Sequence, residues 1–218
     1  MRDFWLLALI FFRCQLGLAQ TAAPAPVSLE HEHHHKIVLE NAYIRILDGL
    51  VVLHDTTPMH IHAANSVVVF LSHSRFGIQL AGGAPVLTDV MPGDLRYADY
   101  GDKPVTHIVW DDGPEAFHFY VVELKKHAPP ADTGVSLSLP GLTRQWRKGP
   151  VTAYHWDIPP GLHYSLPAGD CAFVLIDLSA PKAGGKRPFR FFPPQHAVSI
   201  DGHAHEDAQY ILLQMEER

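Results

Sequence analysis

Short segments rich in Val, Ile, Phe and Tyr follow one another along this chain, and Gly, Pro or Asp interrupts them at regular spacing. No long window carries the 3.6-residue period of an amphipathic helix. Short, evenly spaced strands are typical of a β-sandwich or a β-barrel. The sequence therefore predicts an all-β fold, with strands at residues 36–39, 43–47, 49–54, 66–71, 77–80, 95–98, 107–110, 116–123, 135–139, 152–158, 172–178, 189–192, 196–200 and 208–214.

The strand pattern occurs twice. The segments that begin at His107 and His196 both read His-x4-Asp-Gly, and a strand containing a Tyr follows each of them. Earlier in each half, residues 66–72 resemble residues 173–179. Two matches in the same order predict a duplicated β unit of roughly 90 residues.

The first residues have the features of a secretory signal peptide. A short basic start precedes an apolar segment from Phe4 to Phe12, and Gly17-Leu18-Ala19 provides a cleavage site with small residues. The apolar segment is too short to span a bilayer, which takes about 20 residues. We therefore expect residues 1–19 to be removed near Ala19 and the protein to be periplasmic or secreted. A buried N-terminal helix is the alternative.

Composition shifts divide the rest of the chain. Residues 20–35 are predicted to be a linker that ends in a His-rich tract, His31-Glu-His-His-His35. On a flexible arm such a tract binds divalent ions without fixed geometry, so we expect it to be solvated, with metal delivery or sensing as the alternative. The first β unit is expected over residues 36–124, a second linker over 125–134 and the second β unit over 135–218.

The overall composition suits a globular domain. Hydrophobic residues make up 47% of the chain, and 17 Lys and Arg stand against 23 Asp and Glu. The acidic balance and the lack of a Lys/Arg cluster argue against a nucleic-acid partner. The chain also has 16 His residues, and His is the commonest metal ligand.

One histidine pair has the spacing of a metal site. Residues i and i+2 of a strand point to the same face, so His60 and His62 can both reach one point. A third ligand must come from a neighbouring strand, and His107 opens a suitable one. Three His bind Zn, Fe, Mn, Ni or Cu and leave coordination positions open. The alternative is that these are structural, hydrogen-bonded histidines.

These residues resemble the motifs of the cupin superfamily. The first cupin motif, Gly-x5-His-x-His-x3–4-Glu-x6-Gly, matches at His60 and His62. The second, Gly-x5-Pro-x-Gly-x2-His-x3-Asn, matches at Gly93, Gly101 and the pair His107 and Asp111. The resemblance implies a jelly-roll barrel at residues 36–124 and a degenerate second barrel at 135–218, which together form a bicupin.

The chain departs from the cupin pattern at one position that affects the chemistry. The Glu of the first motif falls on Ser66 or Val67, and neither is a good metal ligand, so the three-His-one-Glu site of the family is not carried over whole. The second half has no His-x-His pair at the corresponding strand. We therefore predict one ion, held in the N-terminal barrel by His60, His62 and His107.

Strand alternation places further residues toward the barrel interior. Ser66, Val68 and Phe70 are predicted to line a pocket beside the ion, with water or an exogenous anion where relatives place a carboxylate. Candidates for acid–base help are Tyr97, Asp111 and His54.

Three functions fit the sequence. The first is an exported three-His metalloenzyme, similar to three-His dioxygenases, that acts on a small anionic substrate. The second is a non-catalytic module that binds a metal or a small ligand, and the third is a purely structural protein without metal. The oligomeric state is left open, a homodimer included.

Overall fold

The computed structural model describes residues 25–125, 137–166, 168–179 and 188–216. The predicted signal peptide and nearly all of the predicted linker at 125–134 lie outside these ranges. Apart from one 3-10 turn, η1 (Leu29–His31), the regular structure of the described residues consists of β-strands. None of the described residues forms a helix long and apolar enough to cross a membrane. The prediction of an all-β protein is confirmed.

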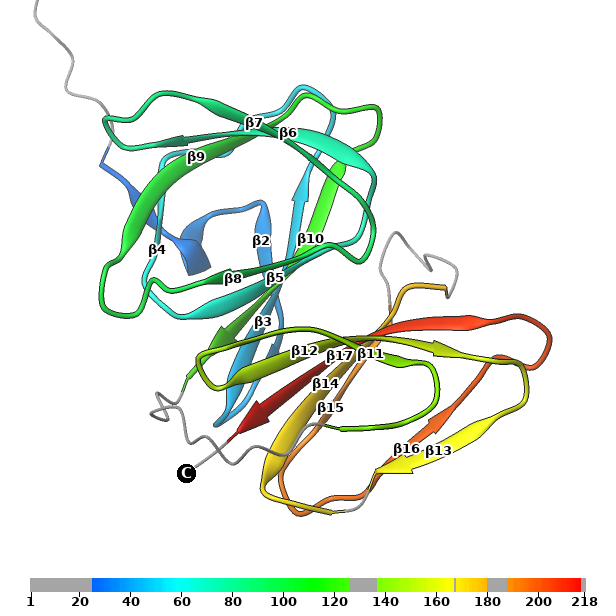
Figure 1. Ribbon diagram of the computed structural model, residues 1–218. Helices are drawn as coiled ribbons and strands as arrows, with labels where there is room; N and C mark the ends of the chain where they lie inside the picture. The colour runs from blue at the N-terminus through cyan, green and yellow to red at the C-terminus, as the bar shows by residue number, and fades with distance from the viewer. Residues whose placement is uncertain (1–24, 126–136, 167, 180–187, 217–218) are drawn as a thin grey trace, which may run out of the picture.

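The N-terminal barrel is built from two five-stranded sheets (Figure 1). The strands of the first sheet are, in spatial order, β1 (Val27–Ser28), β4 (His60–His62), β9 (Val105–Asp111), β6 (Ser74–Leu80) and β7 (Val86–Val90). Those of the second sheet are β2 (His35–Glu40), β3 (Ile44–Val51), β10 (Phe117–Leu124), β5 (Ser66–Phe70) and β8 (Leu95–Ala98).

The C-terminal barrel repeats this topology in a reduced form. Its larger sheet has the order β11 (Leu142–Lys148), β12 (Val151–Ile158), β17 (Ala208–Glu216), β14 (Cys171–Asp177) and β15 (Phe189–Phe192). Its smaller sheet pairs β13 (His163–Leu166) with β16 (Val198–Asp201), as β4 pairs with β9 in the first barrel. Within the described residues, nothing corresponds to β1, β6 and β7. The duplication predicted from the sequence is therefore present, with a smaller second copy.

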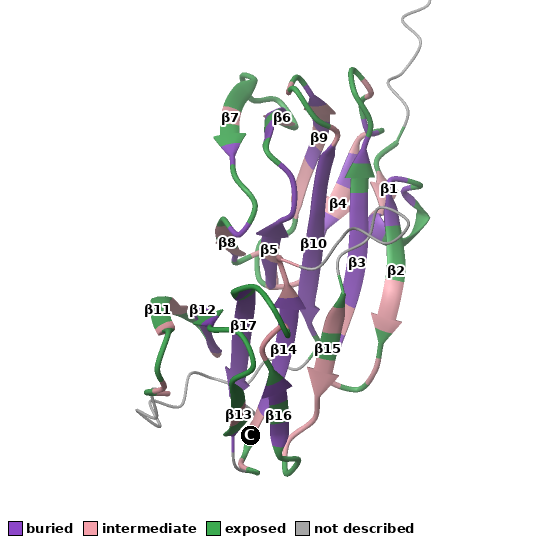
Figure 2. Ribbon diagram, turned by 90° about the vertical axis from the view of Figure 1, so that its right-hand side faces the viewer, coloured by how far each residue is buried: buried purple, intermediate pink, exposed green. Residues whose placement is uncertain are grey.

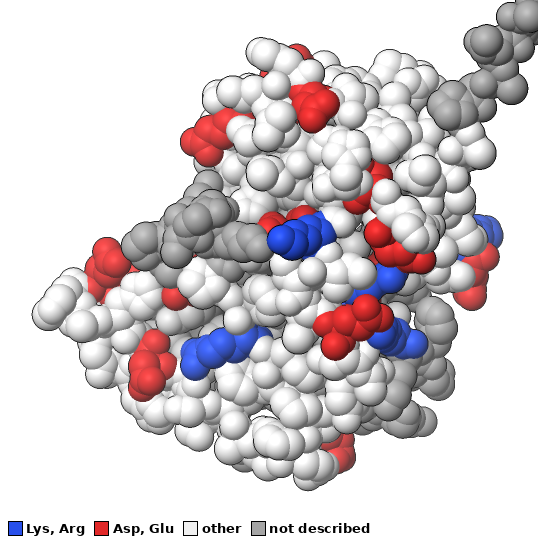
Figure 3. Space-filling view, turned by 180° about the vertical axis from the view of Figure 1, so that it is seen from behind, with Lys and Arg blue, Asp and Glu red and all other residues white. Residues whose placement is uncertain are grey.

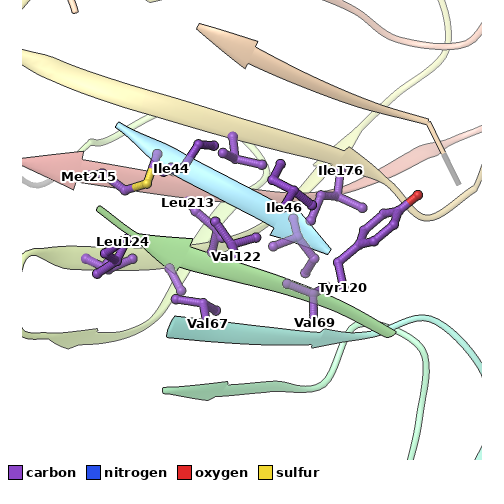
Figure 4. Packing of buried hydrophobic residues seen from close by; sticks show 14 of the residues in the cluster. Ile44, Ile46, Val67, Val69, Tyr120, Val122, Leu124, Ile176, Leu213 and Met215 are labelled. Atoms are coloured by element: carbon purple, nitrogen blue, oxygen red, sulfur yellow. The ribbon is translucent and has the colours of Figure 1, made fainter. Parts of the chain in front are cut away.

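The two barrels share a hydrophobic core between the β2-β3-β10-β5-β8 sheet of the first and the five-stranded sheet of the second. Strand alternation gives β10 two apolar faces: Phe117, Phe119 and Val121 fill the first barrel, while Tyr120 and Val122 point to the second. On the other side of this core, β14 and β17 contribute residues that include Ile176, Leu213 and Met215 (Figure 4). As Figure 2 shows, the strands that meet here, β3, β10, β14 and β17, are mostly buried.

Some predicted elements differ from the structure. The predicted strands at 43–47 and 49–54 are one continuous strand, β3, because Gly49 lies within the ladder instead of turning the chain. The predicted strand at 135–139 falls partly outside the described residues, and residues 137–139 are not in a strand. The sequence did not predict β11 or β7.

The predicted linker at 20–35 requires a correction. Residues 27–35 form β1, η1 and the start of β2, so the barrel begins before Lys36. The cause is apolar burial: Leu29 is only 2% exposed and packs in the core of the first barrel. In the His-rich tract, His31 and His33 are exposed, but His34 and His35 are buried, so the tract is not a solvated arm.

Charged side chains of both signs are scattered over the face shown in Figure 3, and neither sign forms a continuous patch there. This face therefore offers no surface of the single-sign kind that binds nucleic acid.

Candidate metal centre

Four imidazoles meet inside the N-terminal barrel. Ring nitrogens of His35, His60 and His62 all lie within 4.8 Å of one another. His107 joins them, because its Nε2 lies 3.1 Å from Nε2 of His60. The structure thus brings together the three histidines predicted from the sequence and adds His35.

Strand register explains the position of the three predicted residues. β4 pairs antiparallel with β9 so that His60 lies opposite His107, and His62 follows on the same face of β4. The three side chains are almost fully enclosed, with 0% of His60, 7% of His62 and 6% of His107 exposed. The ring centroid of His107 lies 4.6 Å from that of His60 and 4.8 Å from that of His62.

His35 reaches the cluster from the other sheet. It is the first residue of β2 and lies opposite Gly49 of β3. Its ring centroid is 5.1 Å from that of His60 and 5.4 Å from that of Phe119. Gly49 makes this packing feasible, since a Cβ atom there would lie 2.3 Å from a carbon of the Phe119 ring.

Hydrogen bonds determine which ring nitrogen of His60 and of His35 is available to bind a metal ion. Nδ1–H of His60 donates to the carbonyl oxygen of Pro58 at 2.9 Å, and Nδ1–H of His35 donates to Glu32 at 2.5 Å. A neutral imidazole held in this way keeps a lone pair on Nε2, the form that binds metals. The donor set therefore fits a divalent ion.

Three of the four histidines stay uncharged at neutral pH. Burial lowers the pKa of His60 to about 4, that of His62 to about 2 and that of His107 to about 3, and neighbouring imidazoles act in the same direction. Glu32 acts in the opposite direction on His60 and His62, but burial outweighs it, because a charge there would be poorly solvated. These three residues consequently offer an ion neutral nitrogen ligands without competition from protons.

A cavity of about 60 Å³ opens next to the cluster. One water needs about 10–15 Å³ by this measure, so the cavity holds a small molecule or several waters. His35, His62 and His107 form one part of its wall, and Tyr100 and Arg96 also line it. Most other lining residues are apolar: Val68, Phe70, Phe76, Ile78, Ala98, Val109, Phe117, Phe119 and Val121.

Of the six pocket residues predicted from the sequence, three line this cavity: Ser66, Val68 and Phe70. Ser66 is 1% exposed, and its hydroxyl oxygen makes no hydrogen bond to the described residues. The structure thus places Ser66 on the wall of the cavity that His62 and His107 also line.

The other three predicted pocket residues lie elsewhere, which corrects the prediction. Tyr97 is on the opposite face of β8 and packs against Trp146 in the core between the barrels. Asp111 is buried beyond the cavity, where it accepts hydrogen bonds from Ser74 and Gly113. His54 is exposed in a turn with a φ of 64°. Strand alternation alone could not reveal these positions, because the direction of each face depends on the neighbouring strands.

The second barrel has no comparable cluster among its described residues. His163 of β13 lies opposite Asp201 of β16 and forms an exposed hydrogen bond with it at 2.7 Å. His196 is exposed and bonds to the carbonyl of Pro194. The interior is filled instead by apolar side chains such as Tyr154 and Trp156, which are both 0% exposed.

Comparison with solved structures identifies the fold. The bacterial pirin YhhW from Escherichia coli, in complex with nickel(II), matches with a TM-score of 0.57 and 13% identity over 84% of this chain and 91% of its own. The chain is a two-barrel cupin by fold. The predicted cupin architecture is thus confirmed.

Two further solved structures are similar in fold. AerE from Microcystis aeruginosa has a TM-score of 0.55 and 14% identity over 88% of this chain and 98% of its own. A salicylate 1,2-dioxygenase from Pseudaminobacter salicylatoxidans has a TM-score of 0.53 and 10% identity over 80% of this chain and 71% of its own. No protein-family model matches the chain, and no curated protein matches its sequence.

Sequence reasoning missed three residues of this cupin site: His35, Glu32 and Arg96. The signal for the first two was present in the His-rich tract, but the tract had been assigned to a linker. A Leu two positions before that tract, Leu29, was the indication that the segment packs against the barrel. Arg96 lies on the face of β8 opposite Tyr97, and strand alternation alone does not show which of these two faces borders the cavity.

Proposed function

We propose that this cupin is an exported metalloprotein whose N-terminal barrel binds one divalent ion and, beside it, a small anionic ligand. His60, His62 and His107 would hold the ion together with His35. The observation that carries the proposal is the convergence of four buried imidazoles, three of which, His35, His62 and His107, line one cavity. Imidazole ligands suit Zn, Fe, Mn, Ni and Cu.

The environment of the ion determines what it could do. When bound, a divalent ion would supply Lewis acidity toward an oxygen of the ligand. Imidazole ligands carry no charge that offsets the +2 of the ion, and Ser66 adds no carboxylate to the cavity wall. The mostly aromatic and aliphatic walls lower the local dielectric constant, which strengthens electrostatic attraction for an anion. The site therefore favours a negatively charged ligand with an apolar body.

Arg96 supports an anionic ligand independently. It lies on β8 at the exposed side of the cavity, with its guanidinium carbon 6.0 Å from the centre of the Phe76 ring. Among the described residues, no ion pair involves Arg96, although Arg45 and Arg147 each have an acidic partner. A guanidinium left unpaired beside an apolar cavity can bind a carboxylate through two hydrogen bonds.

The reaction that best fits such a site is dioxygenase-like oxidation of a small carboxylic acid. A salicylate 1,2-dioxygenase is among the structures with this architecture. The second candidate is a cupin that binds metal or ligand without turnover, and it is favoured by the small cavity of about 60 Å³.

Two measurements separate these functions. The metal content of untagged protein, expressed without residues 1–19, tests for one tightly held ion per chain. Oxygen uptake by the Fe(II)-loaded protein over a panel of aliphatic and aromatic carboxylic acids then tests for turnover. Metal binding without uptake on any acid would favour the binding module, and protein free of metal after loading and dialysis would exclude every metal-dependent function.

Arg96 provides a direct test of the ligand class. Arg96→Gln should weaken binding of a small carboxylate to the metal-loaded protein by at least 10-fold, measured by isothermal titration. Arg75→Gln is a matched control, since Arg75 is exposed on β6 and does not line the cavity. Equal affinities of wild type and Arg96→Gln would exclude Arg96 as the anion anchor.

Export is tested in the native host. The apolar segment from Phe4 to Phe12 and the small residues before Gln20 support cleavage near Ala19. N-terminal sequencing of the mature protein should start close to Gln20, and a retained Met1 on cytoplasmic protein would contradict export.

A further inference from the structure

A fully buried carboxylate lies directly behind the candidate metal centre. The side chain of Glu32 is 0% exposed. Its Oε2 accepts a hydrogen bond from Nδ1 of His35 at 2.5 Å, and its Oε1 accepts one from Nδ1 of His34 at 2.6 Å. The backbone N–H of His34 donates to both carboxylate oxygens at 3.1 Å.

Both oxygens of this carboxylate are paired with imidazoles, Oε2 with His35 and Oε1 with His34. A buried charge is expensive unless it is paired and hydrogen-bonded. Glu32 meets this condition, and one of its two side-chain partners is a residue of the imidazole cluster.

The second partner connects Glu32 to the surface. Nε2 of His34 lies 3.0 Å from Oδ2 of Asp55, whose side chain is 46% exposed. His34 is thus held between two carboxylates and cannot turn toward the cavity. The four residues form one hydrogen-bonded row, which runs from Asp55 through His34 and Glu32 to His35.

We propose that Glu32 is a positioning residue for the metal ion, acting through His35: its hydrogen bond to Nδ1 fixes the ring so that Nε2 faces the cluster. The inference rests on the proposed function. The cupin motif has a Glu after its histidine pair, and this chain has Ser66 there. The inference goes beyond the proposed function because it assigns a carboxylate role to Glu32, which precedes β2.

The geometry of the segment supports this assignment. η1 ends at His31, and the backbone N–H of Glu32 donates to the carbonyl oxygen of Leu29 while the N–H of His35 donates to the carbonyl oxygen of Glu32. These turns fold the chain back so that Glu32, His34 and His35 share one side. A carboxylate behind a ligating imidazole orients the ring and raises its basicity, and its loss costs about 10–100-fold in metal affinity.

The test compares Glu32→Gln with Glu30→Gln. Glu30 lies on the same segment but is exposed and pairs with Arg45. We expect Glu32→Gln to weaken Co(II) affinity by 10–100-fold in a chelator competition and to change the visible absorption of the bound Co(II). Glu30→Gln should change neither. A double-mutant cycle tests whether Glu32 acts through His35. In a His35→Gln background, Glu32→Gln should lower Co(II) affinity little further.

Structural and positioning roles give different results. If Glu32 only stabilised the fold, Glu32→Gln would lower the melting temperature of the metal-free protein and leave Co(II) affinity and absorption unchanged, which would overturn the inference. Wild-type protein that binds no Co(II) would overturn the proposed function and the inference together. Loss of affinity in Glu32→Gln that persists in full in the His35→Gln background would also overturn it, since Glu32 would not be acting through His35.

One further measurement detects the hydrogen bond between His35 and Glu32 directly. In the Co(II)-loaded wild-type protein, the Nδ1–H of His35 should give a paramagnetically shifted NMR signal that exchanges slowly with water, because the proton is buried against Glu32. The signal is assigned by its loss in His35→Gln. Its absence from loaded wild-type protein would mean that His35 does not ligate the ion in this orientation, and the inference would fail.

Discussion

His60 and His107 lie 47 positions apart in the sequence, yet their Nε2 atoms are 3.1 Å apart across the β4–β9 pair. Two nitrogens that each lie about 2.1 Å from one ion are separated by about 3.0–3.4 Å in octahedral or tetrahedral geometry. The two rings are thus already spaced as ligands of a common ion. Since Nδ1–H of His60 is held by Pro58, the lone pair on its Nε2 faces His107.

Removal of a cluster histidine should reduce metal affinity without unfolding the protein. His62→Ala deletes one nitrogen ligand, and we expect affinity for Zn(II) or Co(II) to fall by more than the 10–100-fold that loss of an outer-shell partner costs. The apolar strands carry most of the burial, so circular dichroism should still show a folded β protein. His196→Ala is the control, because His196 is exposed in the second barrel. Similar affinities of the two variants would contradict the assignment of His62.

Ser66→Glu should restore a carboxylate beside the ion. The hydroxyl of Ser66 lines the cavity and lacks a hydrogen-bond partner among the described residues, so a longer acidic side chain would enter the cavity. We expect tighter metal binding, through charge neutralisation, and weaker binding of a small carboxylate, because the same space is filled. Isothermal titration of the wild type and of Ser66→Glu with Zn(II) and with acetate measures the two effects. Ser66→Ala serves as the control. Unchanged affinities in Ser66→Glu would show that Ser66 is not adjacent to the ion.

Acid should destabilise the metal-free protein. The pKa values of His60, His62 and His107 are about 4, 2 and 3 in the folded state and about 6.5 in the unfolded chain. As the pH falls below 6.5, the unfolded chain therefore binds protons that the folded protein does not, and stability is lost. Each group contributes up to about 1.4 kcal/mol per pH unit down to its folded pKa.

Urea unfolding of the metal-free protein at pH 7, 6 and 5 measures this loss. The triple variant His60→Gln/His62→Gln/His107→Gln should show a much flatter pH dependence, since its three amides do not titrate. Equal slopes in the two proteins would mean that the cluster is not protected from protonation.

Gly49→Ala should disturb the packing that positions His35. A Cβ atom there would lie 2.3 Å from the Phe119 ring, and an overpacked core costs about 1–3 kcal/mol. Because the Phe119 ring contacts His35, metal affinity should fall as well. Gly169→Ala is the control, since no atom lies within 4 Å of its added Cβ. Denaturant unfolding and metal titration measure the free energy of unfolding and the metal affinity of both variants. Equal values for Gly49→Ala and Gly169→Ala would refute this packing role.

The sequence predicted the fold through local signals. Alternating apolar residues, turn residues and the repeated His-x4-Asp-Gly segment are all short-range features, and they sufficed for a duplicated all-β unit. The cupin architecture was implied by the resemblance of the segments around His60, His62 and His107 to the cupin motifs. Strand spacing also sufficed for His60 and His62, because the two-residue period of a strand fixes their common face. The convergence of His107 was inferable once a neighbouring strand was assumed.

The rest of the site depended on contacts that no local pattern reports. His35 and Glu32 lie in a tract whose composition is typical of a solvated arm, and only the burial of Leu29 against the barrel core brings them inside. Tyr97 alternates correctly, but its face of β8 points toward the second barrel. That direction follows from how the two barrels pack together, which is a long-range property.

The most direct test of the central claim is a crystal structure of the protein soaked in Co(II) or Zn(II), with anomalous diffraction used to locate the ion. The account predicts one strong peak in the first barrel, about 2.0–2.3 Å from nitrogens of His60, His62 and His107 and of His35, and none at His163, His196 or His205. A cluster without a peak, or a dominant peak at the exposed His31 and His33, would contradict it.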